Sequence, residues 1–133
     1  MLAQLPWDLV AVFAASGILM ALVSCLIGLP PMIENPLWWL VYATWVYFCF
    51  QRQVEPLFLT LLVSSALAGL LHGSTSAVLL DRYIENNPWH ANKMQGSSGK
   101  LIVQFIAGGI IIGVVFGAAV GAIAWALRRF LLT

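Results

Sequence analysis

The chain has 133 residues, of which 62% are hydrophobic and only 8% are charged, and its net charge is +1. A soluble domain has about a quarter of its residues charged, so this chain could not cover a water-facing surface. The near-neutral charge gives no support for a nucleic-acid partner. Long apolar runs instead predict an all-α fold: a polytopic membrane protein, one domain over residues 1–133, with four transmembrane helices in a compact bundle that contacts the lipid bilayer.

The first predicted span covers residues 8–29, between Pro6 and the pair Pro30-Pro31. Small residues recur in it at spacings of three and four and predict a seam for close helix packing, rather than the alternative of a pore lining: Ala14, Gly17, Ala21, Ser24 and Gly28. Cys25 and Cys49 fall late in the first and second apolar runs, so they would lie near opposite membrane faces. Neither a disulfide nor a metal cluster is therefore expected.

The second predicted span covers residues 36–51, after a turn over residues 30–35 in which Asn35 caps the helix and Pro36 occupies its first turn. This span is short for a bilayer and rich in rings, which suit the membrane interface. Trp38, Tyr42 and Trp45 share one face. We interpret that face as helix packing plus an aromatic belt, with a pigment, quinone or lipid site and a tilted or re-entrant helix as alternatives.

The third predicted span covers residues 56–80 and carries two adjacent stripes. One stripe consists of small residues and predicts a second packing groove: Ser65, Gly69, Gly73 and Ala77. The other is mostly polar and forms a candidate path or ligand-binding surface: Thr60, Ser64, His72 and Ser76. Both stripes have the period of a helix face.

A polar loop over residues 81–100 precedes the last predicted span, residues 101–127, for which Ser98 is the expected cap. The last span has a glycine at every fourth position, at Gly109, Gly113, Gly117 and Gly121. On a helix these positions lie nearly above one another, so they predict a groove without side chains into which another helix can fit.

His72 is the one ionisable side chain well inside an apolar run. We take it as a structural histidine facing the bundle interior. The alternatives are a proton relay and a ligand to haem or quinone. The spacing of His72, Asp81 and Tyr83 loosely resembles that in the small membrane anchor of succinate dehydrogenase, although Arg82 separates the last two and four spans replace three. That resemblance implies a haem- or quinone-binding role for these side chains.

The leading functional hypothesis is a non-enzymatic bundle that associates with itself, as a homo-oligomer, or with other membrane subunits, because it has several packing grooves. A small oligomeric channel or transporter along the polar stripe is the alternative, and a haem- or quinone-binding anchor the third. No catalytic residue, metal site or cofactor is predicted. The basic residues divide equally across the membrane, with Arg52, Arg128 and Arg129 against Arg82, Lys93 and Lys100, and we take the termini as cytoplasmic.

Overall fold

The computed structural model describes residues 1–131, apart from the side chain of Ala91. All regular structure in this part of the chain is helical, with five α-helices and no strand. The α-helices are α1 (Trp7–Leu26), α2 (Pro31–Gln51), α3 (Leu57–Val78), α4 (Leu80–Asn86) and α5 (Ser98–Leu131), and two short 3₁₀ helices are η1 (Leu2–Gln4) and η2 (Pro88–Lys93). The predicted all-α class is confirmed.

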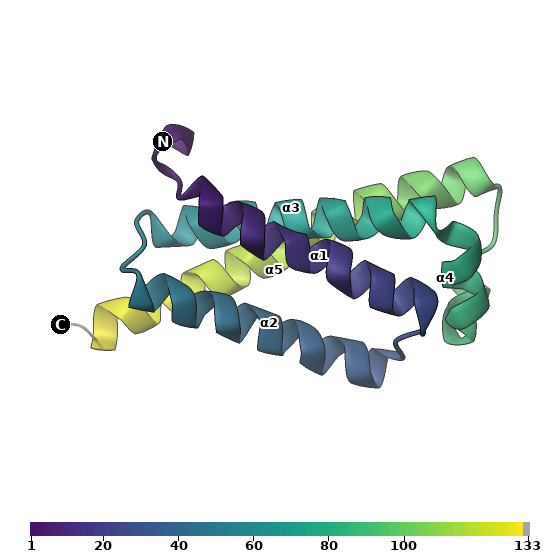
Figure 1. Ribbon diagram of the computed structural model, residues 1–133, viewed down its shortest axis with the longest axis horizontal. Helices are drawn as coiled ribbons and strands as arrows, with labels where there is room; N and C mark the ends of the chain where they lie inside the picture. Colours follow the sequence, from purple (N-terminus) through teal and green to yellow (C-terminus); the bar gives the residue numbers. More distant parts are fainter. Residues whose placement is uncertain (132–133) are drawn as a thin grey trace.

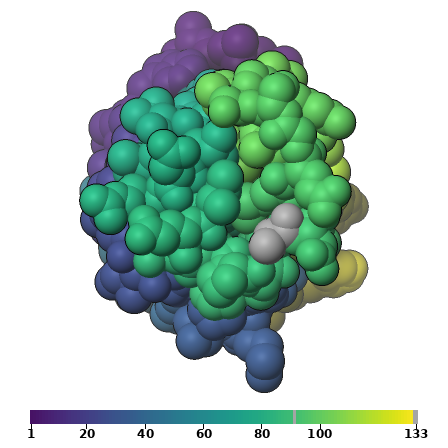
Figure 2. Space-filling model, turned by 90° about the vertical axis from the view of Figure 1, so that its right-hand side faces the viewer, coloured from purple at the N-terminus to yellow at the C-terminus, as the bar shows by residue number. Residues whose placement is uncertain are grey.

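The four long helices run back and forth along the molecule, while α4 closes one end (Figure 1). Helices α3 and α5 lie side by side, α1 crosses diagonally over them, and α2 follows the lower edge. Both termini lie at the end opposite α4. The segment after α3, comprising α4, η2 and the start of α5, covers the other end, as Figure 2 shows.

Three helices are long and apolar enough to cross a membrane: α1, α3 and α5. Helix α5 has 34 residues and extends for about 51 Å at 1.5 Å per residue, more than a ~30 Å hydrocarbon core requires. Helix α2 is as long as α1 and α3, but Glu34, Asn35 and its tryptophan and tyrosine rings make it more polar. Composition and helix length together therefore support a multi-pass membrane protein.

Helix α2 begins five residues earlier than predicted, at Pro31 rather than Pro36. Pro31 occupies the first helical position, where a missing N–H leaves no hydrogen bond unmade, and Pro30 precedes it in an extended conformation. Pro36 then lies inside the helix, where its ring removes only the bond to the Met32 carbonyl. The expected turn over residues 30–35 is therefore wrong, and Glu34 belongs to the first turns of α2.

Helix α1 ends at Leu26, three residues before the predicted end, because Gly28 adopts a left-handed conformation with φ of +87°. A Cβ at Gly28 would also overlap the carbonyl oxygen of Asn86, so α4 packs directly on this turn. Asn87 is fully buried beside it and donates to the carbonyl oxygens of Ser24, at 2.9 Å, and Tyr83, at 2.8 Å. Its own Oδ1 accepts from the Leu29 N–H at 3.2 Å.

The segment expected as a polar loop over residues 81–100 is partly helical, since it contains most of α4, all of η2 and the start of α5. Asn87 separates α4 from η2, which begins at Pro88, because the residue before a proline is disfavoured in an α-helix. The hydroxyl of Ser97, not that of the expected Ser98, accepts from the Lys100 N–H at the start of α5, at 3.4 Å.

The core is aromatic where α1 and α2 meet. Phe13 stacks on Trp45 with ring centroids 5.0 Å apart, and Tyr42 contacts Trp45 edge to face. At the end of the bundle that carries the termini, Arg128 of α5 turns back to the α2–α3 connection. Its guanidinium donates to the Val54 carbonyl at 2.8 Å and pairs with Glu55 at 2.7 Å. Arg128, just after the predicted end of the last span, therefore links α5 to the α2–α3 connection.

Candidate functional site

The glycines of α5 lie against α3. A Cβ at Gly109 would overlap the carbonyl oxygen of Gly69, and a Cβ at Gly69 would overlap that of Gly109. Gly73 approaches the backbone of Phe105 in the same way, and Gly113 that of Ser65. The two backbones therefore touch without side chains between them over several turns, which places the two predicted grooves face to face.

The remaining glycines and the small residues of α1 are also used within the chain. A Cβ at Gly117 would come within 2.8 Å of Ser65, and one at Gly121 within 2.9 Å of Phe58. Gly17 meets the backbone of Ala68, and four further small residues of the predicted grooves are buried: Ala14, Ala21, Ser24 and Ala77. All three predicted grooves thus take part in contacts inside one copy of the chain.

The polar stripe of α3 divides between two surroundings. Thr60, Ser64 and Ser76 are fully buried, and the Thr60 hydroxyl donates to the Pro56 carbonyl at 2.8 Å. The hydroxyl of Ser64 has no hydrogen-bond partner among the described residues. His72, in contrast, lines both of the cavities described below. Thr60, Ser64 and Ser76 line neither of these two cavities.

An inner cavity of about 410 Å³ lies between α2, α3 and α5. This volume is within the range of roughly 300–1,000 Å³ that is typical of small-molecule sites. Helix α2 supplies one polar and aromatic wall, and the bare backbone of α3 and α5 supplies the opposite one. The lining residues are Glu34, Asn35, Trp38, Trp39, Tyr42, Gly69, His72, Gly109, Ile112, Gly113 and Phe116.

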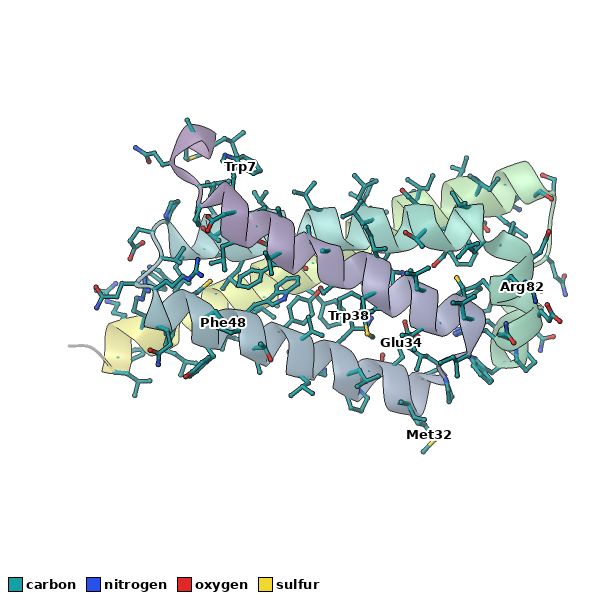
Figure 3. The ribbon with its side chains drawn as sticks, in the orientation of Figure 1. Trp7, Met32, Glu34, Trp38, Phe48 and Arg82 are labelled. Carbon is teal, nitrogen blue, oxygen red and sulfur yellow. The ribbon has the colours of Figure 1, made fainter. Side chains whose placement is uncertain are left out.

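A carboxylate and an imidazole form the polar end of this cavity. Glu34 Oε1 lies 3.7 Å from His72 Nε2, and the two side chains are only 17% and 18% exposed. His72 Nε2 is itself buried and has no hydrogen-bond partner in the described part of the chain. Glu34 and Trp38 both point from α2 into the bundle, whereas Met32 points away from it (Figure 3). The Trp38 ring then contacts the His72 ring edge to face, at 5.7 Å.

Rings form most of the rest of the α2 wall of the cavity. Tyr42 is held in place by a 2.8 Å hydrogen bond between its hydroxyl and that of Ser65, and it stacks on Phe116 at 6.1 Å. Trp39 meets the same Phe116 ring edge to face at 5.7 Å. Trp39 is 51% exposed and Phe116 36%, so this part of the lining lies at the surface between α2 and α5.

An outer cavity of about 330 Å³ adjoins the inner one toward α4 and shares Glu34, His72, Gly109 and Ile112 with it. Burial raises the pKa of Tyr83 there to about 12, with a smaller contribution from the Glu34 carboxylate. Burial, and then the positive charge of Lys93, lower the pKa of His90. Both side chains are thus neutral at neutral pH. The other lining residues are Met94, Leu101, Gln104, Phe105 and Gly108.

Sequence reasoning missed Glu34, the charged member of this site. Because Glu34 was assigned to a turn, the sequence did not predict which way its side chain points. In α2 it lies one helical turn before Trp38, on the face that Trp38, Tyr42 and Trp45 share. An early acidic residue in register with that aromatic face was the available signal. Of the residues that resemble the succinate dehydrogenase anchor, His72 and Tyr83 both line the outer cavity, while Asp81 is exposed at the surface and lines neither cavity.

The site combines one acid, one imidazole, several rings and open backbone, and such a mixture of apolar surface and a few polar groups is typical of small-molecule sites. Among the described residues, no group of three or more His, Cys, Asp or Glu side chains could hold a metal ion. Comparison of the chain with protein-family models, with curated proteins and with solved structures finds no match. The cavity itself is therefore the basis for assigning a function.

Proposed function

We propose that this chain is a non-enzymatic, small multi-pass membrane protein that binds a lipid-soluble small molecule in the inner cavity. The single observation that carries the proposal is that cavity, with apolar rings along most of its wall and one polar pair at its end. Such a combination of apolar surface and a few convergent polar groups is typical of small-molecule sites. The ligand would reach it from the bilayer on the side where Trp39 and Phe116 are partly exposed.

The proposal includes α2 as a fourth membrane-inserted helix. Its 21 residues run alongside α1, α3 and α5, and aromatic contacts join it to each of these helices: Phe13–Trp45, Trp38–His72 and Tyr42–Phe116. The exposed ring of Tyr47, in the last turns of α2, suits the interfacial region. Glu34 would lie near the end of the span, shielded from lipid by the bundle.

A matched pair of α5 substitutions tests the binding function. Ile112 lines the inner cavity at 59% exposure, and its neighbour Ile111 is 63% exposed but lies outside the cavity. Native mass spectrometry of protein released from nanodiscs would measure the non-protein mass that stays bound. We expect wild type and Ile111→Trp to keep a small-molecule adduct that Ile112→Trp loses. Wild type without an adduct, or equal adducts in all three proteins, would count against the proposal.

A second candidate is association with a further copy or with other membrane subunits. The observation that favours it is the outer face of α5, where large apolar side chains are up to about two-thirds exposed: Val103, Ile111, Val115 and Ile123. The predicted grooves support it less, because they are used inside the chain. Cross-linking in mild detergent tests this role, and a strictly monomeric protein would argue against it.

A further inference from the structure

We infer that the molecule held in the inner cavity is an organic cation that carries a ring or a similar apolar group. This inference rests on the proposed binding function and narrows it to one chemical class. The positive charge would lie beside Glu34, and the apolar part would lie among the rings of Trp38, Trp39, Tyr42 and Phe116. Charge, aromatic surface and shape each support it separately.

Glu34 gives the cavity its preference for positive charge. Its side chain is 17% exposed, so it has lost most of its hydration. A carboxylate in such surroundings takes up a proton unless a positive partner offsets the cost of desolvation, so a cation beside Glu34 would be stabilised by the ionised form. The ion-pair partner given by the structure is His72, at 3.7 Å, and an imidazole is charged only when protonated. A bound cation would supply the missing charge, whereas an anion would be repelled.

The aromatic surface favours the same class of ligand. Ring faces carry partial negative charge, and a cation over a ring gains about 0.5–2 kcal/mol, with the larger values in desolvated sites. Four rings line the inner cavity beside Glu34. A neutral molecule would gain the apolar contacts of these rings but would leave the carboxylate without a counter-charge.

The shape of the site also provides room for a bulky cation. Opposite the rings, Gly69, Gly109 and Gly113 present bare backbone to the cavity. The positively charged Lys93 lines the outer cavity and is exposed to solvent, so its field is screened by water. A lipophilic cation that enters from the bilayer between α2 and α5 would reach Glu34 without passing it.

The test compares two probes of nearly the same shape, benzyltrimethylammonium and its uncharged carbon isostere neopentylbenzene. Binding of each to the full chain in nanodiscs would be measured by saturation-transfer NMR with competition. We expect the cation to bind at least about tenfold more tightly than the isostere, a difference of about 1.4 kcal/mol. Glu34→Gln should abolish that preference, whereas Glu85→Gln, at an exposed carboxylate of α4, should preserve it.

A second pair of variants keeps the test decisive if Glu34→Gln does not fold. Trp39→Leu removes a cavity ring that is 51% exposed, and Trp125→Leu removes a ring that is 52% exposed and lies outside both cavities. We expect only Trp39→Leu to weaken binding of the cation. Equal binding of the two probes to wild type would overturn the cation inference and leave the binding function intact. Failure of both probes to bind would also overturn the cation inference, while the adduct measured in wild type and Ile112→Trp decides the binding function by itself.

Discussion

The contact between α3 and α5 makes a sharp prediction about two adjacent glycines. Gly109 faces α3, where a Cβ would overlap the Gly69 carbonyl oxygen and come within 3.3 Å of the Gly73 Cα. Gly108, one position earlier on the same helix, has open space around it, and a methyl group there would meet nothing within 4 Å. Alanine at the two sites therefore adds the same atoms to the same helix in opposite surroundings.

The expected magnitudes follow from these surroundings. Gly109→Ala has to push two backbones apart, because the obstructing atoms are carbonyl and Cα atoms rather than flexible side-chain ends. Overpacking of this kind costs roughly 1–3 kcal/mol. Gly108→Ala meets no obstacle and gains up to about 1 kcal/mol of helix propensity in water. The free energy of unfolding should thus fall in the first variant and stay level or rise in the second.

Steric trapping in bicelles measures this free energy for a membrane protein without harsh denaturant. Gly69→Ala should behave like Gly109→Ala, since the two residues face each other. Once one methyl has separated the helices, a second costs less, so the double variant should show a coupling of at least about 0.5 kcal/mol. Equal stabilities of Gly108→Ala and Gly109→Ala would refute the close backbone contact and, with it, the packing derived from the glycine spacing.

Further predictions concern the polar contacts that join the helices of the bundle and the pH dependence of its stability. Arg128→Met should lower the free energy of unfolding by roughly 2–4 kcal/mol, because buried carbonyl oxygens lose their donors, while Arg52→Met at an exposed pair should change it by less than about 1 kcal/mol. Asn87→Ala should also lower the free energy of unfolding by roughly 2–4 kcal/mol, because three backbone groups lose their hydrogen-bond partner. Asn92→Ala, on the exposed surface, should change it little, and equal effects of the two variants would contradict the anchoring role of Asn87. Burial raises the pKa of Tyr83 to about 12, so the stability that the neutral phenol contributes is fully present below pH 10 and is lost as the pH rises through about 12. Phenolate absorbance should therefore show a late step that Tyr83→Phe reduces.

The sequence by itself determined the kind of molecule and most of its helices. Apolar runs and the scarcity of charge require a lipid environment, and a helix satisfies its backbone hydrogen bonds within one segment, so its presence can be read locally. The spacing of Gly109, Gly113, Gly117 and Gly121 likewise predicts a face on one helix from that helix alone. The starts of helices were less certain: Pro31 and Pro36 both suit a first turn, and only the tertiary structure distinguishes them.

The tertiary structure decided which faces meet and therefore where the site lies. Glu34 and His72 belong to different helices, and their approach depends on the position of α2 against α3 and α5, where large rings hold it at a distance and leave a cavity. Arg128 and Asn87 likewise find partners far away in the sequence. No local pattern encodes such contacts, because a polar side chain in a turn or at a helix end has no predicted direction until the helices around it are packed.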